Sequence, residues 1–151
     1  MEGRATIVTG FETRNPDETR ELGRRIARRI QAGDVLALKG ELGSGKTTMI
    51  QGIIKGLGVD QRVQSPSFVL VRTYHADFEI KHVDLYRLDP QDVDGLHLEE
   101  IYNEDGVMLV EWSEHAGWLP GTLSRVEMVF VPDNPLHRRI TISGPIQKRL
   151  R

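Results

Sequence analysis

The sequence predicts a three-layer α/β fold in which helices flank a mixed central sheet, and three observations lead to this prediction. An apolar segment at 35–39 precedes the glycine-rich stretch Gly40-Glu41-Leu42-Gly43-Ser44-Gly45-Lys46-Thr47, and apolar residues at helical spacing follow it. A second apolar run, 107–111, ends in an acid, which is typical of a buried central strand. Paired segments of alternating apolar and polar residues predict hairpins in addition. Together these patterns predict a P-loop NTPase-like fold.

The N-terminal part predicts a short strand at 6–11 and then a helix. Asn15 is suited to cap that helix, Pro16 to occupy its first position, and two acids to follow in its first turn. Apolar residues line one face, and Gly33 is expected to end the helix. The other sides carry Arg24, Arg25, Arg28 and Arg29. A solvated face is the expected role of these arginines, and contact with RNA stays an open alternative.

The later elements follow from similar patterns. The helix after the glycine-rich stretch is expected to close at Gly56 and Gly58, and Ser65-Pro66 marks a turn. The remaining expected elements are strands at 68–74 and 78–85, a helix at 90–102, a strand at 107–112, and strands at 124–131 and 138–143 joined by a turn at 132–135. The polar end, 147–151, is expected to fray.

Composition limits the classes of protein to which the chain can belong. Its 151 residues are predicted to form a single domain, 1–151. Twenty Lys and Arg against 22 Asp and Glu give a net charge of −2, so no overall basic field indicates nucleic-acid binding. There is no cysteine, which excludes disulfides and thiolate metal sites. No secretory signal or membrane-spanning run is recognisable, so a soluble cytoplasmic protein is expected.

The glycine-rich stretch matches the phosphate-loop pattern G-x-x-x-x-G-K-[ST] at every fixed position. Its backbone amides and the following helix N-terminus would face a bound anion. Lys46 would reach the β- and γ-phosphates, and the Thr47 hydroxyl would hold Mg²⁺. The predicted ligands are therefore ATP and Mg²⁺. The predicted nucleotide contacts are Glu41, Leu42, Gly43, Ser44, Gly45, Lys46, Thr47 and Thr48.

Two acids are candidates for the catalytic part of the site. Glu111 ends the apolar strand at the edge where such sheets bind ligands, and its carboxylate could hold Mg²⁺ or position water. Asp84 ends another strand, although a salt bridge with Arg87 would explain it equally well. Strand alternation predicts that Trp112 faces away from Glu111, into the core. His82 could contact nucleotide or Asp84, but a structural role is the expected one.

Four blocks, of which the first contains the phosphate loop, resemble the TsaE (YjeE) family of bacterial P-loop ATPases, over about residues 13–143. These blocks are 33–48, Ser65-Pro66-Ser67-Phe68-Val69-Leu70-Val71, His82-Val83-Asp84-Leu85-Tyr86-Arg87-Leu88 and Leu109-Val110-Glu111-Trp112-Ser113-Glu114. The chain departs from the family pattern at Ser67, where threonine is usual, and at His97, where glycine is common.

The resemblance implies an Mg-dependent ATPase that supports the N6-threonylcarbamoyladenosine (t6A) modification of tRNA, at the adenosine next to the anticodon. It implies TsaD and TsaB as protein partners, tRNA contact through their complex, and slow hydrolysis without them. It also implies that Glu111 is a metal-linked carboxylate, that Asp84 is a supporting acid, and that the segment 65–68 is a switch near the γ-phosphate.

Two other functions remain compatible with the phosphate loop. A small P-loop kinase would phosphorylate a metabolite, but no convincing arginine-bearing lid segment is recognisable. A non-catalytic switch would use nucleotide only to order residues 65–68 for docking.

Overall fold

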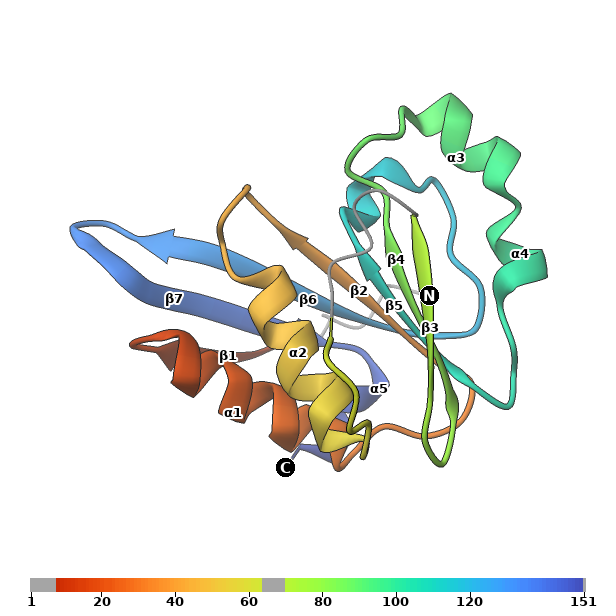
Figure 1. The fold of residues 1–151 in the computed structure, drawn as a ribbon. Helices are drawn as coiled ribbons and strands as arrows, with labels where there is room; N and C mark the ends of the chain where they lie inside the picture. The colour runs from red at the N-terminus through yellow and green to blue at the C-terminus, as the bar shows by residue number, and fades with distance from the viewer. Residues whose placement is uncertain (1–7, 64–69, 151) are drawn as a thin grey trace, which may run out of the picture.

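The computed structural model describes residues 8–63 and 70–150, which form a seven-stranded sheet with helices on both faces (Figure 1). The strand order is β1-β7-β6-β2-β5-β4-β3. The central strands β6, β2, β5 and β4 pair in parallel, whereas β1, β7 and β3 pair antiparallel to their neighbours. The strands are β1 (Val8–Thr13), β2 (Asp34–Gly40), β3 (Val71–His75), β4 (Glu79–Asp84), β5 (Val107–Glu111), β6 (Thr122–Val131) and β7 (Asn134–Ser143). The predicted mixed sheet is confirmed.

Helices cover the sheet unequally. Helices α1 (Pro16–Ala27) and α2 (Lys46–Gly56) pack on one face, where Ile26 and Ile53 join a core with Leu109 of β5. Helices α3 (Pro90–Leu96) and α4 (Leu98–Ile101) contribute to a smaller core on the opposite face, which contains Val110. Successive strand residues point to opposite faces, so β5 is buried on both sides. A 3-10 turn, η1 (Ser113–His115), and α5 (Pro145–Arg149) complete the described elements.

Helix α1 begins as the sequence predicts but ends earlier. The Asn15 side chain accepts a hydrogen bond from the Glu18 amide at 2.9 Å, and Pro16 is the first helical residue. The helix ends at Ala27, before Gly33. Two glycines allow α1 and α2 to touch: a Cβ at Gly23 would lie 2.5 Å from a carbonyl of α2, and one at Gly52 would lie 2.2 Å from a carbonyl of α1.

Two predicted elements differ from the observed ones. The helix expected at 90–102 is two short helices, because His97 between them adopts a left-handed conformation with φ of 53°. The C-terminal hairpin is longer than expected, because β6 begins at Thr122 and β7 already begins at Asn134. The turn is therefore centred on Pro132 and Asp133, and Asp133 has the positive φ of 65°.

The expectation that residues 147–151 fray is wrong for 147–150. Residues Pro145–Arg149 form helix α5, and Gln147 is buried, with its side-chain amide donating to the Thr9 hydroxyl at 2.7 Å. Arg149 pairs with the buried carboxylate of Asp34 at 2.6 Å. Sequence polarity was misleading because these polar groups have partners inside the fold.

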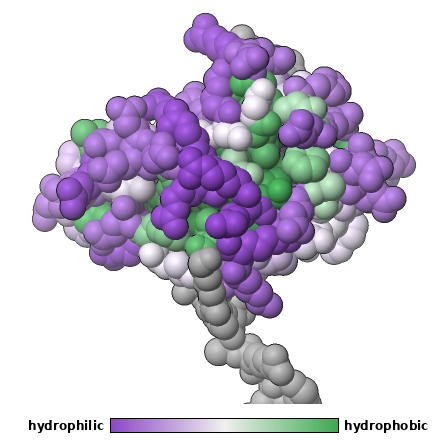
Figure 2. All heavy atoms as spheres, turned by 90° about the horizontal axis from the view of Figure 1, so that it is seen from below, coloured by the Kyte–Doolittle hydropathy of each residue, from purple (hydrophilic) through white to green (hydrophobic). Residues whose placement is uncertain are grey.

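Some predictions fall outside the described residues. These are the start of the first strand, at 6–7, the segment 65–68 and the last residue. In the part that is described, no helix is both long and apolar enough to cross a membrane. The face at the bottom of the view in Figure 1 is largely hydrophilic, with smaller hydrophobic areas between (Figure 2).

Candidate nucleotide-binding site

A hollow of about 330 Å³ lies where the phosphate loop meets the carboxyl ends of β4 and β5. The parallel register places Glu111 of β5 opposite Leu38 of β2 on one side and Asp84 of β4 on the other. Of the predicted nucleotide contacts, Leu42, Gly43, Gly45, Lys46, Thr47 and Thr48 line this hollow, and so do both predicted acids, Asp84 and Glu111. Residues almost 70 positions apart in the sequence therefore line one hollow.

The phosphate loop has the backbone that its glycines permit. Gly43 and Gly45 have φ values of 80° and 103°, which side-chain-bearing residues rarely adopt. Gly40 is needed for space, since a Cβ there would lie 2.5 Å from the Ser44 hydroxyl. Ser44 is buried and does not line the hollow, and the Glu41 side chain lines a neighbouring one. These two residues would contact a ligand at most through their backbone.

Lys46 begins helix α2 and is 5% exposed. Its ammonium donates to the carbonyl of Gly40 and, at 3.0 Å, to the carbonyl of Glu41. Burial lowers the pKa of this ammonium, while the nearby carboxylates Glu111, Glu114 and Asp84 act in the opposite direction. A cationic donor therefore sits at the loop with acids around it, a charge distribution suited to a metal-bearing polyphosphate.

Glu111 is held by two hydrogen bonds from different elements. Its Oε1 accepts from the Thr47 hydroxyl at 2.9 Å, and its Oε2 lies 2.7 Å from Nε2 of His82. Because an ionised carboxylate only accepts, Nε2 is the donor of that bond. His82 is fully buried, and its Nδ1 has no hydrogen-bond partner among the described residues. The structure thus gives His82 a positioning contact with Glu111, which agrees with the structural role expected from the sequence.

Asp84 is buried at the end of β4 and lies beside Glu111. Its Oδ1 accepts a hydrogen bond from the Tyr86 amide at 2.9 Å, which closes the turn after the strand. Asp84 thus has a structural partner and also lines the hollow, although it lies 38 positions after Lys46 in the sequence. The place in the site that the sequence predicted for Asp84 is compatible with this geometry.

The prediction for Trp112 holds in part, because Trp112 packs against the core on the opposite face and also lines the site. Strand β5 ends at Glu111, and Trp112 has φ of 56°, so the alternation of the strand does not extend to it. The half-buried indole turns to the loop, with the Lys46 ammonium 4.1 Å from its ring centroid. Tyr86 packs against it at 4.8 Å between centroids. Trp112 is therefore a wall of the site as well as a neighbour of the opposite core.

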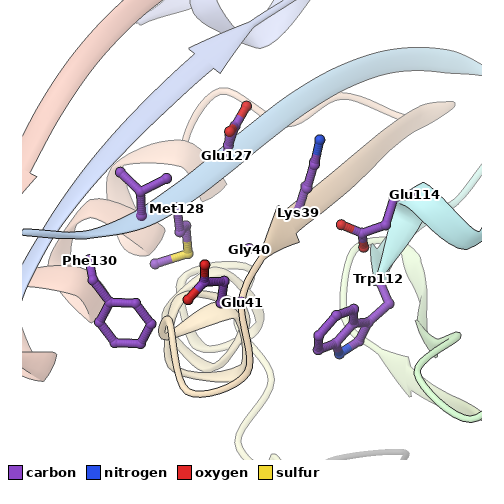
Figure 3. Close-up of a pocket in the computed structure, with 9 residues that line it drawn as sticks. Lys39, Gly40, Glu41, Trp112, Glu114, Glu127, Met128 and Phe130 are labelled. Carbon is purple, nitrogen blue, oxygen red and sulfur yellow. The ribbon is translucent and has the colours of Figure 1, made fainter.

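A second hollow, of about 390 Å³, adjoins the first at Trp112 (Figure 3). In Figure 3 the Glu41 side chain lies between Phe130 of β6 and Trp112. Lys39, Glu114 and Glu127 form a charged rim. Gly40 and Glu41 of the phosphate loop line this second hollow, whereas Leu42 and Gly43 line the first.

Arg138 of β7 is a site neighbour that no sequence pattern indicated. Its guanidinium donates to the carbonyls of Ser44 and Gly43, at 2.8 and 3.1 Å. A side chain from 94 positions later thus contacts the phosphate loop from the side of the hairpin. The arginine lies in an alternating strand, where a solvated position is the ordinary expectation.

The residues present fit a magnesium ion that also binds phosphate. Among the described residues, no three or more His, Cys, Asp or Glu side chains are grouped to hold a metal alone. Mg²⁺ in nucleotide sites takes one or two carboxylates, phosphate oxygens and waters. The hydroxyl of Thr47 and the carboxylate of Glu111, which touch each other, are oxygen donors of that kind.

Comparison with known proteins identifies the family. The model of the family "Threonylcarbamoyl adenosine biosynthesis protein TsaE" matches residues 13–140. The chain belongs to the TsaE family. The match includes the phosphate loop, both acids and Arg138.

Several TsaE proteins are similar over most of the chain. The tRNA threonylcarbamoyladenosine biosynthesis protein TsaE of a Nostoc species is 37% identical over 131 residues, covering 83% of this chain and 80% of its own. The protein of that name from Treponema pallidum is 31% identical, covering 87% and 97%. A crystal structure of YdiB from Bacillus subtilis superposes with a TM-score of 0.80 at 29% identity, covering 98% of this chain and 97% of that one. Both the family and the fold are thus shown.

Proposed function

We propose that this TsaE-family chain binds and hydrolyses ATP, with Mg²⁺, in the cytoplasmic machinery that makes t6A at the adenosine next to the tRNA anticodon. The observation that supports this most is the meeting of Lys46, Thr47 and Glu111 in one hollow. TsaD and TsaB are the proposed partners, and hydrolysis is proposed to be slow without them. The relatives named for this biosynthesis support the biological role.

The loop residues would bind and orient the triphosphate. The amides from Gly43 to Thr48 surround the N-terminus of α2, whose dipole favours anions. Lys46 would exchange its carbonyl acceptors for β- and γ-phosphate oxygens. A bound magnesium ion would neutralise charge on those oxygens as the terminal bond breaks.

The acids would act next to the terminal phosphate. Glu111, already fixed by Thr47 and His82, would hold the metal or orient the attacking water without first reorganising. Asp84 would add negative charge beside it and help to hold metal-bound water. Trp112 would limit water access from one side.

Contact with tRNA is proposed to occur through the complex. Arg24 on α1 and Arg28, the residue after its end, both pair with Glu21 of the helix, at 2.9 and 4.0 Å, so their charge is partly balanced. This pairing favours the solvated-face interpretation. Replacing the four arginines Arg24, Arg25, Arg28 and Arg29 should then leave retention of tRNA by the complex unchanged.

The deciding experiment is ATP hydrolysis measured with and without TsaD, TsaB and tRNA. Slow ADP formation that rises when both proteins are added would support the proposal, and Lys46→Ala should abolish nucleotide binding. Rapid phosphorylation of a small metabolite without partners would refute the proposal and favour the small P-loop kinase instead. Nucleotide-dependent assembly with no ADP formation would favour the non-catalytic switch.

A further inference from the structure

We infer that Arg138 is a positioning residue that holds the phosphate loop in its anion-binding conformation. The inference rests on the proposed nucleotide site and adds a residue from a distant strand to it. The guanidinium bonds four backbone carbonyls: those of Ser44 and Gly43 on the loop, at 2.8 and 3.1 Å, and those of Pro135 and His137 on its own hairpin, at 2.7 and 2.8 Å.

The guanidinium is fixed on its face as well as at its edge. Phe130 is the cross-strand partner of Arg138 in the β6–β7 register, and its ring centroid lies 4.4 Å from the guanidinium carbon. Cation–π contact and a planar fork of donors together restrict the side chain to one arrangement. The rigid hairpin can therefore transmit its position to the loop.

The bonded carbonyls are the ones whose direction matters for binding. In a phosphate loop the amides must face the anion, so the intervening carbonyls must point away from it. Gly43 and Gly45, with positive φ, have wide conformational freedom that binding would otherwise have to restrict. By holding the carbonyls of Gly43 and Ser44 outward, Arg138 reduces that ordering cost before the ligand arrives.

Replacing Arg138 with lysine separates the effect of its positive charge from the effect of its planar set of donors. A lysine ammonium keeps the positive charge but cannot span two loop carbonyls and two hairpin carbonyls in one plane. Arg139, the next residue of β7, provides a matched control: its exposed guanidinium pairs with Glu12 at 3.5 Å and, among the described residues, forms no hydrogen bond or ion pair with the loop. Removing its charge changes the same strand without touching the loop.

The test compares Arg138→Met, Arg138→Lys and Arg139→Met for binding of Mg·ATP and of inorganic tripolyphosphate, by calorimetry well below each melting temperature. In Arg138→Met both dissociation constants should rise about tenfold, equal to ~1.4 kcal/mol. Arg138→Lys should lie between this variant and the wild type, and Arg139→Met should bind as the wild type does. A loss confined to ATP would show that Arg138 acts on the base, and unchanged affinity for both ligands would show a merely structural role; either result overturns the inference.

A ligand-free measurement keeps the inference separate from the proposed function. Amide hydrogen exchange over residues 43–47 should be faster in Arg138→Met and Arg138→Lys than in the wild type, and unchanged in Arg139→Met. A wild-type protein that binds no ATP would refute the proposed function, while the exchange rates would still decide whether Arg138 orders the loop. If Arg138→Met does not fold, Arg138→Lys alone carries both measurements.

Discussion

Replacing Glu111 should separate its structural from its catalytic contribution. In Glu111→Ala, the Thr47 hydroxyl and Nε2 of His82 lose their acceptors, and the fully buried imidazole has no described partner left. A buried polar group without a partner costs ~1–3 kcal/mol. A domain of this size loses about 2–4 °C in melting temperature per kcal/mol, so a fall of about 2–12 °C is expected.

Glu111→Gln keeps the side-chain volume and can still bond Thr47 and His82 through its amide, so its melting temperature should fall by less than about 4 °C. Its ATP hydrolysis, measured with TsaD and TsaB present, should fall at least ~100-fold, because a neutral amide cannot replace a carboxylate at the metal or as a base. ATP binding should change little, since the loop is intact.

Glu127→Gln provides the control, because it removes one exposed carboxylate from β6 close to the loop without contacting Thr47 or His82. It should change neither melting temperature nor hydrolysis. Full turnover by Glu111→Gln would remove Glu111 from the mechanism. An unchanged melting temperature in Glu111→Ala would contradict the buried contacts themselves.

Three further predictions concern other parts of the structure. Because burial lowers the pKa of Lys46 below its ordinary 10.5, ATP affinity should decline at alkaline pH before that value is reached, and calorimetry in two buffers should detect proton uptake on binding. Arg149→Met leaves the Asp34 carboxylate buried without its cation; stability should fall by ~2 kcal/mol, and an unchanged melting temperature would contradict the docking of α5. Gly52→Ala places a Cβ 2.2 Å from the Arg20 carbonyl and should cost ~3 kcal/mol in thermal unfolding, whereas Gly95→Ala, with open space around it, should not.

The sequence alone predicted those features whose structure depends on a local pattern of residues. The loop from Gly40 to Thr47 requires glycine at fixed places, and an apolar run ending in Glu111 indicates the strand edge where ligands bind. The N-terminus of α1 could be predicted because Asn15 caps it with its own side chain. Each of these features depends on residues within a few positions of one another.

The sequence did not predict features that depend on how the chain turns after a helix or strand ends. The alternation rule placed Trp112 against the opposite core, which it does contact, but did not predict its place in the site, because a positive φ of 56° turns the residue after β5 to the loop. His97 divides a helix in the same way, at φ of 53°. Polar composition predicted a frayed tail because the partners of Gln147 and Arg149 come from residues more than 100 positions earlier.

The contacts around the site explain why the residues that orient Glu111 and the phosphate loop were harder to predict than the residues proposed to do the chemistry. Glu111 and Thr47 meet because β5 pairs in parallel with β2, the strand that leads into the loop. His82 reaches the same carboxylate because β4 pairs with the other side of β5. Strand order, which no local pattern encodes, thus decides which side chains orient the acid. The same reasoning applies to Arg138, which approaches the loop from β7, two strands away from β2, and can do so only because its side chain extends past β6 over Phe130.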